Sequence, residues 1–195
     1  MHPDGFTPEF IEALRLLGSA MEEVTAANQQ RPILVGGAAL LLWTTGRYVS
    51  GDFDLVGVDP KPMEEALIRR GVRREDRRGH LKRDLYHPTL DIGVEFVSGR
   101  LFDGNADPNR LRLVTITPGS RVLVIPVEDV IADRLGQCAS HPKSSRAMLQ
   151  QAVQAWRLAP EIDNAYLDER IRTETASTLD LARFEELMAN ENDQP

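Results

Sequence analysis

Two aspartates separated by one residue, Asp52 and Asp54, are the residues of this chain best suited to chemistry. They stand in an apolar stretch typical of a strand, where side chains two residues apart point to the same face. Two ionised carboxylates on one face repel each other, so the pattern favours a positive partner between them. A magnesium ion held by carboxylates and phosphate oxygens meets that need. The pattern therefore predicts metal-dependent phosphoryl chemistry on a nucleotide.

A third carboxylate on a neighbouring strand would complete such a metal cluster. Two candidates, Asp91 and Glu95, lie on the same face of a strand expected over residues 90–97. We prefer Glu95, because Val94 and Phe96 flank it and pin the backbone, and because a Ser-Gly pair soon ends the strand. Asp91 stays open as the alternative.

A pair of glycines, Gly36 and Gly37, precedes the aspartates and ends a short apolar run. Because glycine has no Cβ atom, its backbone can approach a phosphate closely. A helix expected over residues 38–44 would aim its free N–H groups and the positive end of its dipole at the same anion. Ser50 could add a hydroxyl to the phosphates, and Arg47 a charge. Each motif alone is weak, but their order along the chain predicts a nucleotide site.

The elements expected around these residues form an α+β fold, a mixed sheet flanked by helices and followed by a C-terminal helical part. A helix capped by Thr7 opens the pattern. Strands are expected over residues 33–35, 53–58, 90–97, 112–116 and 121–125. After Pro126 only helical patterns follow. The expected organisation is an α/β core over residues 1–126 and a helical region over residues 127–195.

The composition is that of an ordinary soluble globular protein. Of 195 residues, 23 are basic and 30 acidic, and the net charge of −7 argues against non-specific coating of nucleic acid as the main role. A single cysteine, Cys138, excludes an internal disulfide and a cysteine-based zinc site. We find no secretion signal at the N-terminus, and the longest apolar stretch, residues 33–43, is too short to span a membrane. These features predict a cytoplasmic protein without a membrane partner.

Three short segments together resemble the polymerase-beta-like nucleotidyltransferase superfamily: LVGG at residues 34–37, DFD at residues 52–54 and VEF at residues 94–96. The finer pattern RxxSxDxD at residues 47–54 is similar to the AbiEii/AbiGii-type group, which includes the toxins of type IV toxin–antitoxin systems. The segment PVEDVIADRL at residues 126–135 resembles the helix that opens the C-terminal part in that group.

The resemblance implies a nucleotidyltransferase-like core and a magnesium- or manganese-dependent enzyme. Such an enzyme transfers a nucleoside monophosphate from a nucleoside triphosphate (NTP) to a hydroxyl of RNA, protein or a small molecule. The glycine pair and Ser50 would hold the triphosphate, while metal binding and catalysis would fall to Asp52, Asp54 and Glu95. Where the group tends to carry a lysine, this chain has Arg134, which can clamp phosphate with a different geometry. A toxin of this group would be neutralised by a partner antitoxin.

Other functions stay open beside this one. The arginine-rich residues 69–83 could bind the phosphates of an RNA acceptor. Glu75 and Asp76 interrupt the run of basic residues, however, and favour an ordinary solvated surface. The main alternative is a catalytically inactive module of the same fold with a binding or regulatory role. It is suggested by the absence of a clear counterpart to the group's later Lys-Asp…Asp run in this sequence. A drug-modifying enzyme would use the same chemistry on a small hydroxylated acceptor.

Overall fold

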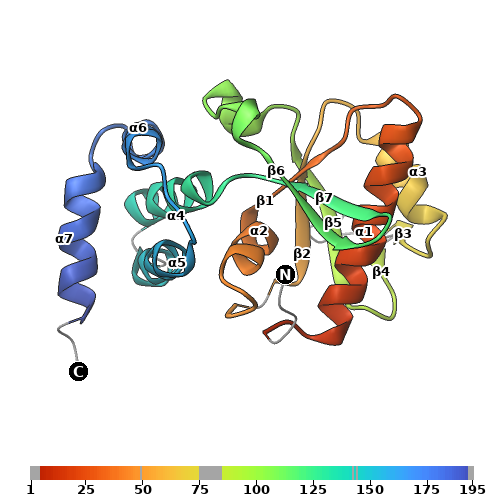
Figure 1. Ribbon diagram of the computed structural model, residues 1–195, viewed down its shortest axis with the longest axis horizontal. Coiled ribbons are helices and arrows are strands. Elements are labelled where there is room, and N and C mark those ends of the chain that lie inside the picture. Colours follow the sequence, from red (N-terminus) through yellow and green to blue (C-terminus); the bar gives the residue numbers. More distant parts are fainter. Residues whose placement is uncertain (1–4, 49, 75–84, 142, 144, 193–195) are drawn as a thin grey trace. The chain divides into compact units, whose positions relative to one another are not determined.

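The computed structural model describes residues 5–48, 50–74, 85–141, 143 and 145–192. The chain divides into two compact units, Met1–Ile125 and Pro126–Pro195. The first unit holds a sheet with helices, and the described part of the second consists of helices (Figure 1).

In the first unit, one mixed sheet of seven strands has the order β3-β4-β5-β2-β1-β7-β6. Its strands are β1 (Ile33–Val35), β2 (Asp52–Val56), β3 (Arg73–Arg74), β4 (Leu85–His87), β5 (Ile92–Ser98), β6 (Arg112–Thr117) and β7 (Ser120–Val124). The pairs β2–β5 and β1–β7 are parallel, and the other neighbours are antiparallel. The helical elements are α1 (Pro8–Ala26), α2 (Gly36–Trp43), α3 (Lys61–Ile68), and the short 3-10 helices η1 (Leu101–Gly104) and η2 (Pro108–Arg110). The expectation of a mixed sheet flanked by helices is confirmed.

The first helix begins as the sequence predicts. The side chain of Thr7 accepts a hydrogen bond from the backbone N–H of Phe10 at 3.2 Å, and Pro8 occupies the first turn. The apolar stripe of α1 is buried, and the ring of Phe10 approaches that of Phe53 on β2, with 5.8 Å between the centroids. Helix α1 packs beside α3 (Figure 1). The Phe53 side of β2 therefore faces the core under α1.

The second unit contains α4 (Val127–Ser140), α5 (Ser145–Leu158), α6 (Asn164–Glu174) and α7 (Leu181–Asn192). Helix α4 packs against both α5 and α6. Trp156 of α5 meets Phe184 of α7 edge to face, with 5.8 Å between the ring centroids, and Phe184 is fully buried. Among the described helices of the chain, none combines the length and the apolar character that crossing a membrane requires.

Candidate functional site

The carboxylates predicted from sequence share one face of two neighbouring strands. Because Phe53 points to the core under α1, the alternation of a strand turns Asp52 and Asp54 to the opposite face. In the parallel pairing of β2 with β5, Asp54 stands beside Glu95, and Asp52 stands beside Gly93. Paired strands lie about 4.8 Å apart, so Asp54 and Glu95 are close neighbours of like charge. A bound cation would relieve their repulsion.

The glycine pair, called here the diglycine bend, lies against these carboxylates. Gly36 has a φ of +64°, and a Cβ atom placed there would come within 2.1 Å of Asp54 Oδ2. A Cβ at Gly37 would lie 3.1 Å from Ser50 Oγ. The absence of side chains at the bend therefore makes room for the carboxylate of Asp54 and the hydroxyl of Ser50.

Helix α2 starts at the diglycine bend, two residues earlier than the sequence predicts. Val35 occupies its N-cap position, and no side chain there accepts from the first N–H groups of the helix. Such a helix start presents N–H donors and the positive end of the helix dipole to an anion. Ser50 Oγ donates a hydrogen bond to the carbonyl of Asp52 at 2.8 Å, which holds the loop before β2 in place.

The strand register distinguishes the two candidates for the third carboxylate. Glu95 is half-buried within β5, beside Asp54. Asp91 is exposed in the turn before β5 and has a φ of +48°. The geometry thus favours Glu95. Within the described ranges, however, no three His, Cys, Asp or Glu side chains are placed so that they could hold a metal ion together. The metal site therefore stays a prediction.

The two arginines predicted to bind phosphate, Arg47 and Arg134, belong to different units. Arg47 is exposed after the end of α2, where its backbone N–H donates to the carbonyl of Thr44 at 3.3 Å. Arg134 belongs to α4 of the second unit, where it is buried and its Nη1 donates to Gln137 Oε1 at 3.1 Å. The roles of both arginines toward phosphate stay predictions.

Three arginines in the described part of the arginine-rich segment form ion pairs with acidic side chains. Arg69 and Arg70 both bind Glu23 of α1, with 2.6 Å between Arg70 Nη1 and Glu23 Oε2, and together they lower the pKa of Glu23. Arg74 forms an ion pair with Glu64 of α3. These ion pairs favour a structural role for Arg69, Arg70 and Arg74 over a role in RNA binding. Arg73 is exposed on β3, and the other basic residues of the segment lie outside the described residues: Arg77, Arg78, Lys82 and Arg83.

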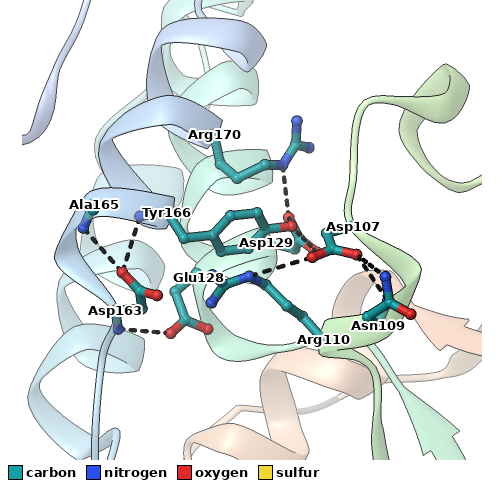
Figure 2. A network of polar contacts seen from close by, with 9 residues as sticks. All are labelled: Asp107, Asn109, Arg110, Glu128, Asp129, Asp163, Ala165, Tyr166 and Arg170. Carbon is teal, nitrogen blue, oxygen red and sulfur yellow. Dashed lines mark hydrogen bonds and ion pairs between the residues drawn. The ribbon is translucent and has the colours of Figure 1, made fainter.

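A buried polar network in the second unit was not predicted from sequence (Figure 2). Asp129 of α4 is fully buried, and its carboxylate accepts from Arg170 Nε at 2.7 Å and from the hydroxyl of Tyr166 at 3.1 Å. Arg170, itself 1% exposed, also donates to Glu174 at 2.5 Å. Burial raises the pKa of Asp129, and the bonds from Arg170 and Tyr166 oppose that rise. The only sequence signal was the i, i+4 spacing of Tyr166 and Arg170 on one helix face.

The structure therefore brings together Asp54, Glu95, the diglycine bend and Ser50, with Asp52 two residues before Asp54 on the same strand face. Comparison of the chain with protein-family models and with curated proteins finds no match.

Proposed function

We propose that this chain is a metal-dependent nucleotidyltransferase, which moves a nucleoside monophosphate from an NTP to a hydroxyl acceptor. The observation that carries the proposal is the contact between Asp54 and the diglycine bend. The carboxylate fills the place of a side chain at Gly36, at the start of a helix whose N-cap residue, Val35, makes no side-chain capping hydrogen bond. A negative group for a metal and a helix end for a phosphate thus lie next to each other.

The oxygen donors suit magnesium or manganese, which prefer carboxylate and phosphate ligands. Asp52, Asp54 and Glu95 would hold the metal, which when bound would neutralise triphosphate charge and polarise its oxygens. The backbone N–H groups at the diglycine bend would bind the triphosphate. Ser50, fixed to the carbonyl of Asp52, would keep the preceding loop against the phosphates.

In the proposed reaction, the acceptor hydroxyl oxygen forms a bond to the α-phosphorus. The bond between that phosphorus and the oxygen bridging to the β-phosphate breaks, and pyrophosphate leaves with the bridging oxygen. The hydroxyl proton passes to Glu95. In the sheet, β2 lies between β1 and β5. The diglycine bend follows β1, so Glu95 on β5 stands on the other side of β2 from the bend. The acceptor would therefore approach from the β5 side while the bend holds the leaving group.

A second candidate is a nucleotide-binding module of the same architecture without turnover. It is favoured by the finding that no three potential ligands within the described ranges are arranged to hold a metal ion. This module would bind NTPs but release no pyrophosphate with any acceptor. RNA as acceptor, and a toxin role with a neutralising antitoxin, rest on the resemblance alone. Co-expression with the product of a neighbouring gene would test the antitoxin.

Replacing Asp54 with asparagine is expected to weaken magnesium-dependent NTP binding about 100-fold, because it removes a charged metal ligand with little change in shape. Isothermal titration with ATP, CTP, GTP and UTP, with magnesium and then with EDTA, would measure this. The matched control is Asp91→Asn, which alters an exposed carboxylate outside the strand and should leave binding unchanged. Equal affinities for Asp54→Asn and the wild type, or no NTP binding by the wild type, would contradict the proposal.

A further inference from the structure

A cavity of about 440 Å³ is lined by residues of α1, of the corner after α3, and of β4 and the turn that follows it. Its polar lining residues are Glu12, Arg15, Ser19, Arg70, His87 and Thr89. We propose that this cavity binds the phosphate group of a small organic phosphate. Helix α1 covers the Phe53 side of β2, whereas the carboxylates of the candidate site face the other side. The inference therefore does not depend on the proposed function.

Arg70 supplies a fixed positive charge in the wall of the cavity. A guanidinium has five N–H groups, and that of Arg70 donates five hydrogen bonds within the protein. They reach the hydroxyl and the carbonyl of Ser19, the carbonyl of Ala66 and the carboxylate of Glu23. All three nitrogens take part, so the charge is held in one position before any ligand arrives.

The arginines around the cavity outnumber the acids that pair with them. Arg69 and Arg70 share the carboxylate of Glu23. Arg15 binds Glu12, with 2.7 Å between Arg15 Nε and Glu12 Oε2. These three guanidiniums and two carboxylates together leave one positive charge, which an anionic ligand would balance.

His87 offers the cavity a donor with a fixed position. Its Nδ1 accepts from the backbone N–H of Leu90 at 3.2 Å and from that of Thr89 at 3.4 Å, so the ring proton lies on Nε2. Nε2 lies near the corner after α3, since a Cβ at Gly71 would stand 3.6 Å from it. In the part of the chain that the structure describes, this Nε2–H donates to no other residue. It is therefore available to a ligand.

Two side chains of α1, Arg15 and Ser19, add further donors about one helical turn apart. Arg15 uses Nε and Nη2 for Glu12, which leaves both N–H groups of Nη1. Ser19 Oγ accepts two hydrogen bonds from Arg70, so its own O–H is left to donate. Neither donor meets an acceptor within the described ranges. The cavity thus combines positive charge with spare donors, while its Glu12 is already paired, and this suits an anion.

The arrangement of the donors favours phosphate over a carboxylate. They come from α1 and from β4, and a phosphate directs three strong acceptor oxygens to different sides, whereas the two oxygens of a carboxylate lie in one plane. The volume of about 440 Å³ falls within the roughly 300–1,000 Å³ of small-molecule sites. It leaves room for the organic group that carries the phosphate.

Isothermal titration of the full chain in EDTA would test the site with glycerol phosphate, inorganic phosphate and acetate. His87→Asn keeps an acceptor for the N–H groups of the turn but lacks the Nε2 donor. It should weaken glycerol phosphate about tenfold, because one hydrogen bond to a charged group is lost. Arg15→Gln should weaken it at least as much. Arg183→Gln is the matched control, since it removes an arginine from another exposed i,i+3 ion pair, in the second unit, and should change nothing.

Each other outcome would overturn the inference. Wild-type protein that binds no glycerol phosphate has no such site, and the nucleotidyltransferase proposal is unaffected. Unchanged affinity in both His87→Asn and Arg15→Gln would place the anion elsewhere, and a loss in Asp54→Asn would place it at the candidate nucleotide site. Acetate or inorganic phosphate that binds more tightly than glycerol phosphate would exclude an organic phosphate as the ligand. Thermal unfolding of each variant identifies any loss of fold.

Discussion

Gly36→Ala is expected to abolish magnesium-dependent NTP binding and to lower the free energy of unfolding by about 2–4 kcal/mol. A φ of +64° is unfavourable for alanine, and the new Cβ would come within 2.1 Å of Asp54 Oδ2. The substitution therefore displaces the carboxylate that the proposed site needs. Urea unfolding of the first unit and NTP titration would measure the two effects.

A double variant separates the loss of stability from the loss of binding. Adding Asp54→Ala to Gly36→Ala removes the oxygen that the new methyl group would meet, so we expect about half of the lost stability to return. NTP binding should not return, because the carboxylate is gone. Gly57→Ala is the matched control, since a Cβ there would meet no atom closer than 3.6 Å. Wild-type NTP affinity in Gly36→Ala would show that the bend is not part of a nucleotide site.

Asp129→Ala is expected to destabilise the second unit by about 3–5 kcal/mol. The guanidinium of Arg170 would stay buried but would lose the carboxylate of Asp129 that balances its charge. Tyr166→Phe removes only one hydrogen bond to the same carboxylate and should cost about 1 kcal/mol. Urea unfolding followed by the fluorescence of Trp156, in a Trp43→Phe background, would report on this unit.

The control for this network is an ion pair of the same unit that is open to solvent. Arg183 and Glu186 of α7 form such a pair, with side chains 56% and 62% exposed, so Glu186→Ala should cost no more than about 0.5 kcal/mol. A loss below about 1 kcal/mol for Asp129→Ala would mean that the buried carboxylate contributes little, and that α4 and α6 are joined mainly by apolar packing.

Local patterns predicted most of the strands that carry the site. The alternation around Phe53 placed Asp52 and Asp54 on one face, and the buried strand before Gly36 was expected. Strands β3 and β4 were missed, because they have only two and three residues and show no run of alternating apolar side chains. Helix α2 begins two residues earlier than predicted. Glycine has a low helix propensity, so the sequence pattern placed the helix start after the glycine pair. The structure instead uses Gly36, with its positive φ, as the first residue of the helix.

The arrangement of the site depends on contacts that no local pattern specifies. The sequence suggested Glu95 as a third carboxylate, but only the pairing of β2 with β5 places it beside Asp54. The contact between Asp54 and Gly36 likewise depends on the pairing of β1 with β2, which sets Val35 opposite Asp54. Asp129 is 37 residues from Tyr166, so their hydrogen bond follows from how α4 and α6 pack. Such long-range pairings are set by tertiary packing.

A crystal structure of the wild-type chain with magnesium and a non-hydrolysable NTP tests the central claim most directly. The account predicts phosphates at the backbone N–H groups of Gly36 and Gly37, and a metal ion held by Asp52, Asp54 and Glu95. A nucleotide bound elsewhere, or side chains of Asp54 and Glu95 that turn away from the metal, would contradict it.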